Sequence, residues 1–166
     1  MHADAGQDFA AEISGSKAIP PVFGRFASMM GLFDLPAMYG ATEELWFPEW
    51  DVKGRPWDSA LYEKFSPSKY VDQFQTPCLV ITGERDYRVP YTQSLEFFTL
   101  QKKNVASRLI VYANAGHWPD WYEMALYCTA HLEWFHKYLE GTAPPWTAEQ
   151  FLRNAVFDSA TGERMK

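Results

Sequence analysis

The sequence predicts an α/β fold in which helices flank a parallel sheet, and three observations predict it. Two apolar runs typical of short buried strands lie at residues 78–81 and 108–112. Between them, residues 91–103 have the pattern of a helix. A strand, a helix and a second strand in this order form a unit whose strands run parallel.

The elements around this unit follow from the same patterns. Residues 27–33 are mostly apolar and could form a core strand, whereas residues 34–67 are rich in Trp, Pro, Gly and acids. In the second segment we expect short helices and loops that form a lid or a wall. A last helix is expected over residues 121–139, stopped by Gly141 and the two prolines at 144–145. The apolar side chains expected in the core are Leu95, Phe98 and Leu100 in the first helix, and Met124, Cys128, Leu132, Phe135 and Leu139 in the last.

Charge and composition exclude several kinds of partner. The 166 residues carry a formal charge of −6 without a run of Lys or Arg, so neither a nucleic acid nor an anionic membrane surface is indicated. No apolar run reaches the roughly 18 residues of a membrane span, and residues 1–10 lack the features of a secretory signal, so the sequence assigns no compartment. A small or peptidic substrate is the expected partner. Cys78 and Cys128 are isolated and are expected to be buried free thiols.

Two titratable residues follow the two predicted strands. Asp86 comes after residues 78–81, and His117 comes after residues 108–112. In open α/β sheets the crevice outside the carboxyl ends of the strands is the usual site of chemistry, so these side chains could meet there. The alternatives are a turn aspartate that binds backbone donors and a histidine at the surface. No phosphate loop or metal-ligand pattern occurs in the sequence, so no cofactor or metal is predicted.

Several motifs support a resemblance to a known family. They are MYG at residues 38–40, TEELWFPEW at 42–50, FSP at 65–67, TP at 76–77, GERDYRVP at 83–90 and GHW at 116–118. In sequence and in order they resemble the C-terminal part of the catalytic domain of prolyl oligopeptidase-type serine peptidases, especially the acylaminoacyl-peptidase and dipeptidyl-peptidase-like branch. The resemblance implies that residues 24–140 form an incomplete α/β-hydrolase domain, between a divergent segment at 1–23 and a tail at 141–166.

The resemblance also implies roles for particular residues. His117 would be the general base, and Asp86 the acid that orients its imidazole, in a Ser-Asp-His triad that cleaves peptide bonds through an acyl-enzyme. The residues implied for the substrate pocket are Glu43, Glu44, Trp46 and Phe47, with Trp50 beside them. Ordinary packing of the aromatic side chains is the alternative. The two arginines beside the acid, Arg85 and Arg88, could pair with Glu43, Glu44 or Glu84.

The nucleophile of such a triad is missing from the sequence. These hydrolases carry it in a Gly-x-Ser-x-Gly turn upstream of the acid, and no such string occurs here. Ser14 and Ser16 lack the second glycine and are expected to be loop or cap residues. We therefore expect a truncated or mis-started product of a longer gene, with the missing N-terminal half or a second copy as candidate partners. A related esterase and a non-catalytic pseudoenzyme or interaction fragment stay open as alternatives.

Overall fold

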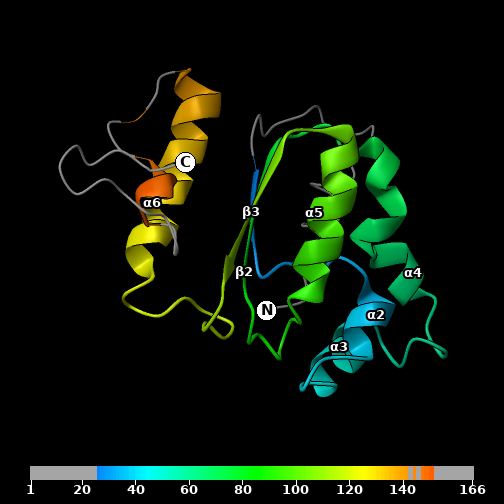
Figure 1. Ribbon diagram of the computed structural model, residues 1–166. Helices are drawn as coiled ribbons and strands as arrows, with labels where there is room; N and C mark the ends of the chain where they lie inside the picture. The colour runs from blue at the N-terminus through cyan, green and yellow to red at the C-terminus, as the bar shows by residue number, and fades with distance from the viewer. Residues whose placement is uncertain (1–25, 142–143, 145–146, 152–166) are drawn as a thin grey trace. The chain divides into compact units, whose positions relative to one another are not determined.

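The computed structural model describes residues 26–141, residue 144 and residues 147–151 (Figure 1). The predicted divergent segment at 1–23, with Ser14 and Ser16, and most of the predicted tail lie outside the described residues. The chain divides into two compact units, one ending at Trp118 and the other starting at Pro119. Each unit is described by itself.

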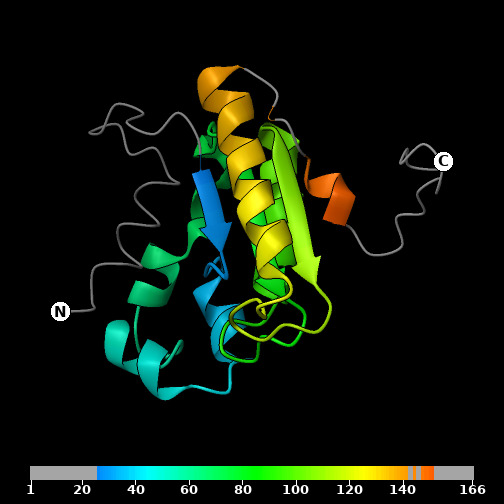
Figure 2. The same ribbon diagram turned by 90° about the vertical axis from the view of Figure 1, so that its left-hand side faces the viewer.

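A parallel three-stranded sheet forms the centre of the first unit. Its strands are β1 (Phe26–Met29), β2 (Cys78–Gly83) and β3 (Ser107–Tyr112), in the order β1-β2-β3. Phe26 pairs with Cys78 and Ile81 pairs with Ile110, both in parallel register. Figure 2 shows the arrows of β1 and β3 pointing the same way. The predicted parallel arrangement is therefore confirmed.

The first strand is shorter than the run at 27–33 predicts. It ends at Met29, and Met30 takes a left-handed backbone conformation with φ 45°. A non-glycine residue in this conformation interrupts the extended backbone that a strand requires. The remaining apolar residues of the run are still used in the core, since Phe33 is completely buried.

Short helices connect β1 to β2, as the composition of residues 34–67 predicts. They are α2 (Leu35–Tyr39), α3 (Trp46–Asp51), α4 (Leu61–Phe65) and the 3₁₀ helix η1 (Pro67–Gln73). The carboxylate of Asp34 accepts a hydrogen bond from the backbone N–H of Ala37 at 2.9 Å and so caps the start of α2. A second apolar cluster holds these helices together, and its buried members are Leu35, Met38, Val52 and Tyr62.

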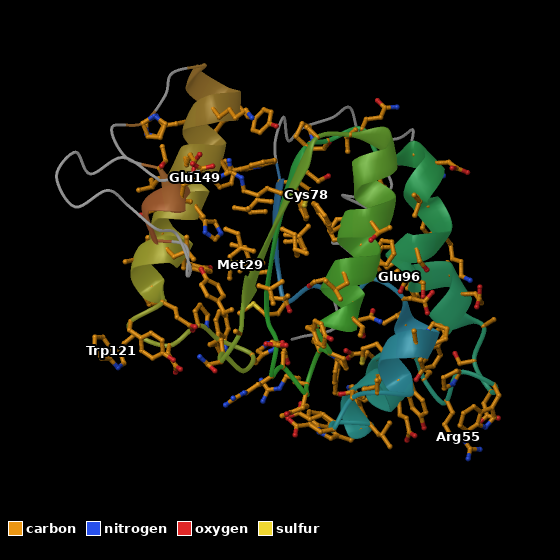
Figure 3. All side chains as sticks on the ribbon, in the orientation of Figure 1. Met29, Arg55, Cys78, Glu96, Trp121 and Glu149 are labelled. Carbon is orange, nitrogen blue, oxygen red and sulfur yellow. The ribbon has the colours of Figure 1, made fainter. Side chains whose placement is uncertain are left out.

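Helix α5 (Thr92–Asn104) connects β2 to β3 and contacts both strands (Figure 1). The main cluster of the core contains Phe33, Phe74, Cys78, Val80 and Phe97, and Figure 3 shows Cys78 between the sheet and α5.

Phe98 of α5 packs against this main cluster, as predicted. The prediction for Leu95 was wrong: its side chain is 36% exposed, because the buried face of α5 is formed by the neighbouring Gln93, Ser94 and Phe97. The side chain of Leu100 lies outside the described part.

The second unit contains α6 (Met124–Phe135), a π turn η2 (His136–Glu140) and the 3₁₀ helix η3 (Ala148–Phe151). Gly141 ends the helical segment in a left-handed conformation with φ 69°, as predicted. The predicted core face was wrong, because Met124, Cys128, Leu132 and Leu139 are exposed, whereas Thr129, Ala130 and Trp134 are buried. Apolar side chains occur around most of α6, so their spacing could not identify the buried face.

Candidate active site

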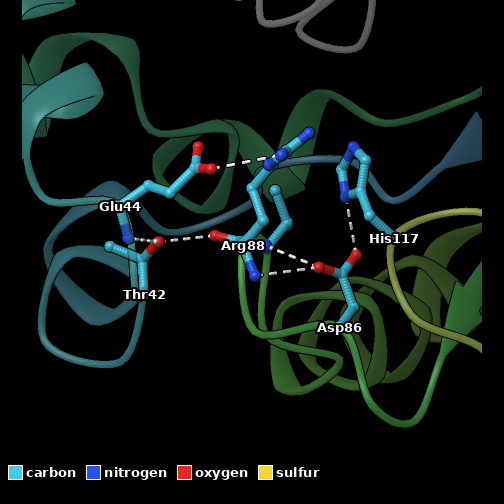
Figure 4. A network of polar contacts seen from close by, with 6 residues as sticks. Thr42, Glu44, Asp86, Arg88 and His117 are labelled. Carbon is cyan, nitrogen blue, oxygen red and sulfur yellow. Dashed lines mark hydrogen bonds and ion pairs between the residues drawn. The ribbon is translucent and has the colours of Figure 1, made fainter.

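Asp86 and His117 lie at the carboxyl ends of two neighbouring strands. Asp86 follows β2 and His117 follows β3, which pair in parallel. The imidazole Nδ1 of His117 lies 2.9 Å from the carboxylate Oδ2 of Asp86 (Figure 4). The structure therefore brings together the two residues that the sequence analysis selected.

Close contact between the two loops makes this approach possible. The backbone N–H of Arg85 donates to the carbonyl of Ala115 at 2.9 Å. At Gly83, the last residue of β2, an added Cβ would lie 2.1 Å from the carbonyl oxygen of Gly116 and 2.5 Å from that of Ala115. Real Cβ atoms do not approach backbone atoms so closely. Only glycine at position 83 lets the loop that carries His117 lie against the end of β2.

The two carboxylate oxygens of Asp86 have different partners. Oδ1 accepts the backbone N–H groups of Arg88 at 3.0 Å and Val89 at 2.8 Å, whereas Oδ2 binds the imidazole of His117. The side chain is completely buried. One oxygen therefore organises the turn, as the turn interpretation expects, and the other is directed at His117. The catalytic role of Asp86 stays a prediction.

His117 is held with a defined ring orientation. A carboxylate in its ionised form can only accept hydrogen bonds, so with that form this contact is a hydrogen bond in the tautomer whose Nδ1 carries the proton. The other ring nitrogen, Nε2, points away from Asp86 (Figure 4). The side chain is 25% exposed, and the ring of Trp118 meets it edge to face with centroids 5.6 Å apart. In this tautomer, Nε2 is the basic atom that can take a proton from a neighbouring hydroxyl.

The residues predicted for the pocket have different surroundings. Trp46 is 69% exposed and meets the ring of Phe47 at 6.2 Å between centroids. Phe47 packs against the apolar cluster of the short helices, so part of this aromatic group serves packing. Glu43 is exposed, and its backbone N–H donates to the carbonyl of Tyr87 at 2.8 Å. The pocket role of these residues stays a prediction.

One predicted ion pair is present. Nη2 of Arg88 lies 3.1 Å from Oε1 of Glu44, with both side chains partly exposed. An exposed pair of this kind contributes at most about 1 kcal/mol. The pair nevertheless shows that the segment after α2 contacts the loop that carries Asp86.

Two residues that shape this site could not be assigned a role from the sequence. The spatial requirement for glycine at position 83 depends on a loop more than thirty positions away in the sequence. The hydroxyl of Thr42 donates to the carbonyl of Arg88 at 2.6 Å, across 46 positions. Both residues belong to the motifs at 42–50 and 83–90, but sequence spacing carries no signal for such distant contacts.

The described residues contain two free cysteines and several residues of the types that can bind metals. Among them, no group of three or more His, Cys, Asp or Glu side chains is placed to hold a metal ion. Cys78 is buried, as predicted, and burial raises the pKa of its thiol. Cys128 is exposed, so the prediction that it is buried was wrong. In the same described part, no helix combines the length and the apolar character that crossing a bilayer requires.

Known proteins are similar to this chain in sequence. The sequence matches the prolyl oligopeptidase family over residues 16–142. It is 36% identical to dipeptidyl-peptidase 5 of Porphyromonas gingivalis over 102 residues, which is 58% of this chain and 15% of that protein. It is 38% identical to dipeptidyl-peptidase 5 of Schizosaccharomyces pombe over 90 residues, covering 53% of this chain and 13% of that protein. The chain thus spans about 15% of the length of the relatives it matches.

Solved structures share the fold. An acylaminoacyl peptidase of Pyrococcus horikoshii superposes with a TM-score of 0.73 at 20% identity, covering 90% of this chain and 25% of that one. A puromycin-hydrolyzing peptidase of Mycobacterium tuberculosis gives 0.71 at 21% identity, covering 86% of this chain and 22% of that one. The parallel sheet with its helices is therefore part of an α/β-hydrolase fold, as predicted.

Proposed function

Because the chain belongs to the prolyl oligopeptidase family, we propose that Asp86 and His117 are the acid and the base of a serine peptidase that hydrolyses peptide bonds. The observation that carries the proposal is the 2.9 Å contact between Oδ2 of Asp86 and Nδ1 of His117. This contact fixes the tautomer in which Nε2 accepts a proton. It also places a negative charge where the imidazolium would form.

The proposed reaction has two halves, and His117 carries out two proton transfers in each. Nε2 of His117 takes the proton of a serine hydroxyl while the serine oxygen attacks the peptide carbonyl. The same nitrogen then gives that proton to the departing amine, and an acyl-enzyme remains. Water then attacks the carbonyl of the acyl-enzyme while Nε2 takes a proton from it. The same nitrogen gives that proton to the serine oxygen as the ester bond breaks, which releases the carboxylic acid and restores the serine hydroxyl. Throughout, Asp86 stays ionised and stabilises the charged imidazole.

The serine would come from outside this sequence, which has no Gly-x-Ser-x-Gly string. The substrates we propose are peptides, in keeping with the peptidase names of the relatives in both comparisons. The same missing string favours a second candidate for the isolated 166 residues, namely a chain that retains the acid and base geometry without turnover. Removal of the nucleophile from a triad leaves only a small residual rate.

Substitutions at the acid and the base test the proposal. In a longer form that carries the nucleophile turn, His117→Ala should lower kcat for a fluorogenic peptide by about 10⁴-fold or more, with Asp86→Asn somewhat less damaging. His131→Ala, in the second unit, is the matched control and should keep its activity. Near-normal turnover in either site variant would remove that residue from the triad. A matched carboxylic ester assayed in parallel separates a peptidase from an esterase.

A further inference from the structure

The hydroxyl of Thr42 joins two loops that are distant in the sequence. Its Oγ1 donates to the backbone carbonyl of Arg88 at 2.6 Å, across 46 positions of the chain. The same oxygen accepts the backbone N–H of Glu44 at 3.1 Å. Figure 4 shows Thr42, in the segment after α2, linked to Arg88 in the loop that carries Asp86. The hydroxyl thus uses both its donor and its acceptor capacity at this junction.

Toward the candidate site, Thr42 binds Arg88, which also binds the carboxylate of Asp86. The backbone N–H of Arg88 donates to Oδ1 of Asp86 at 3.0 Å, while its carbonyl accepts the hydroxyl of Thr42. Arg88 is therefore fixed at both of its backbone polar groups. The carbonyl of Tyr87 is held as well, by the backbone N–H of Glu43 at 2.8 Å. Together these bonds restrict the turn that orients the Asp86 carboxylate.

On the other side, Thr42 is anchored to the core. Its backbone N–H donates to the carbonyl of Met38 at 2.9 Å. Met38 is completely buried in the apolar cluster of the short helices, where Tyr62 is buried too. A continuous series of contacts therefore runs from the buried cluster of the short helices through Thr42 to the carboxylate.

The nearby ion pair is a weaker connection between the same loops. Glu44 and Arg88 have side-chain exposures of 27% and 46%, so solvent screens their attraction. The Thr42 contact is also open to solvent, but it is the shorter one and ends on the backbone, whose movement the carboxylate must follow. The hydroxyl, rather than the ion pair, is placed to control the turn.

We propose that Thr42 is a positioning residue for Asp86, and that its hydroxyl holds the 86–89 turn in the geometry that keeps the carboxylate on His117. The catalytic consequence rests on the proposed function, whereas the structural consequence does not. Loss of the hydroxyl should let the turn open locally without unfolding the sheet.

Two measurements on the full chain test the structural consequence without any activity assay. The first is amide hydrogen exchange at Arg88 and Val89, whose N–H groups bind Oδ1 of Asp86. Thr42→Val should increase both rates about fivefold, the change that corresponds to one net hydrogen bond. The second is the NMR signal of the His117 Nδ1 proton, which should broaden or move upfield. Core amides of β2 should keep their exchange rates.

Three variants make the test specific. Thr42→Ser retains the hydroxyl and should behave as wild type, whereas Thr42→Ala should repeat the effect of Thr42→Val. Glu44→Gln removes the ion pair and should change both signals less than Thr42→Val. Unchanged signals in Thr42→Val, an equal effect of Glu44→Gln, or a uniform rise in exchange through the β2 core would each overturn the proposal.

The longer form that carries the nucleophile adds a kinetic readout. There, Thr42→Val should lower kcat about fivefold and leave KM nearly unchanged, because the hydroxyl acts through Asp86 and not on the substrate. An unchanged kcat in an active enzyme would contradict the catalytic part of the proposal. If the wild-type longer form hydrolyses no peptide, the proposed function fails, and the exchange and NMR data still decide the role of Thr42.

Discussion

The two oxygens of Asp86 show how one buried side chain serves the local fold and the site together. Oδ1 satisfies two backbone donors of its own turn, so the carboxylate cannot rotate without leaving those N–H groups without partners. Oδ2 is thereby held toward His117. In the proposed reaction, a carboxylate fixed in this way needs no reorganisation when charge develops on the imidazole.

Gly83 is the residue on which contact between the two loops depends most directly. Gly83→Ala would force the new Cβ against two backbone carbonyls, which cannot move aside as a flexible side chain can. We expect a loss of about 3 kcal/mol in the free energy of unfolding, measured by urea denaturation. Gly40→Ala is the control, because the nearest atom to its Cβ lies at 3.7 Å. Equal stability of the two variants would show that the loops do not touch as described.

Two buried serines differ in whether their hydroxyls are used. Within the described residues, Ser28 Oγ is buried and has no hydrogen-bond partner. Ser28→Ala should therefore leave the free energy of unfolding unchanged or raise it by about 1 kcal/mol. Ser66 Oγ accepts the N–H of Leu35 at 2.9 Å and donates to the carbonyl of Tyr62 at 2.6 Å.

The control substitution follows from that difference. Ser66→Ala leaves two buried backbone groups unpaired and should cost about 2–3 kcal/mol in the same urea titration. A larger loss in Ser28→Ala than in Ser66→Ala would mean that the hydroxyl of Ser28 has a partner in solution.

Strand ends and buried helix faces differ in how well the sequence predicts them. The meeting of Asp86 and His117 could be predicted, because parallel strands place their carboxyl ends at one edge of the sheet. The buried faces of α5 and α6 could not, because they depend on what each helix contacts. Leu95 is exposed while Gln93 is buried, since the amide oxygen of Gln93 accepts the backbone N–H groups of Phe33 and Asp34. No periodicity of apolar residues can predict a buried polar anchor of this kind.

The short helices between β1 and β2 carry a buried phenol that makes their stability sensitive to alkaline pH. Tyr62 of α4 donates to the carbonyl of Gly54 at 3.0 Å, and burial raises its pKa to about 12. An unfolded tyrosine titrates near pH 10. The folded state therefore holds its proton more tightly, so stability is fully present below about pH 10 and is lost as the pH rises toward about 12.

Tyr62→Phe tests this assignment. The variant should be less stable than wild type at neutral pH, because it lacks the hydrogen bond to Gly54. Between about pH 10 and 12 its free energy of unfolding should fall less steeply, since one titrating group is gone. Denaturant titrations at several pH values supply both comparisons. Parallel pH profiles for the two proteins would show that Tyr62 does not titrate with a raised pKa.

The reactivity of the two thiols, Cys78 and Cys128, can be used to measure global unfolding of the chain. Cys78 lies on β2, which pairs with β1 on one side and β3 on the other, and its side chain belongs to the main core cluster. Cys128 is exposed on α6. A thiol buried in the central strand can react only when the strand is uncovered, and burial raises its pKa further from the reactive thiolate.

Iodoacetamide labelling followed by mass spectrometry should therefore add one group rapidly, at Cys128, and a second at least about a thousandfold more slowly, at Cys78. Cys128→Ser should remove the rapid step alone. If Cys78 reacts through global unfolding, its labelling rate should rise with urea along the slope of the equilibrium unfolding curve. A slow labelling rate of Cys78 that does not change with urea concentration would instead indicate local opening of the sheet edge. Equal labelling rates for both thiols would contradict a core in which β2 is the central strand.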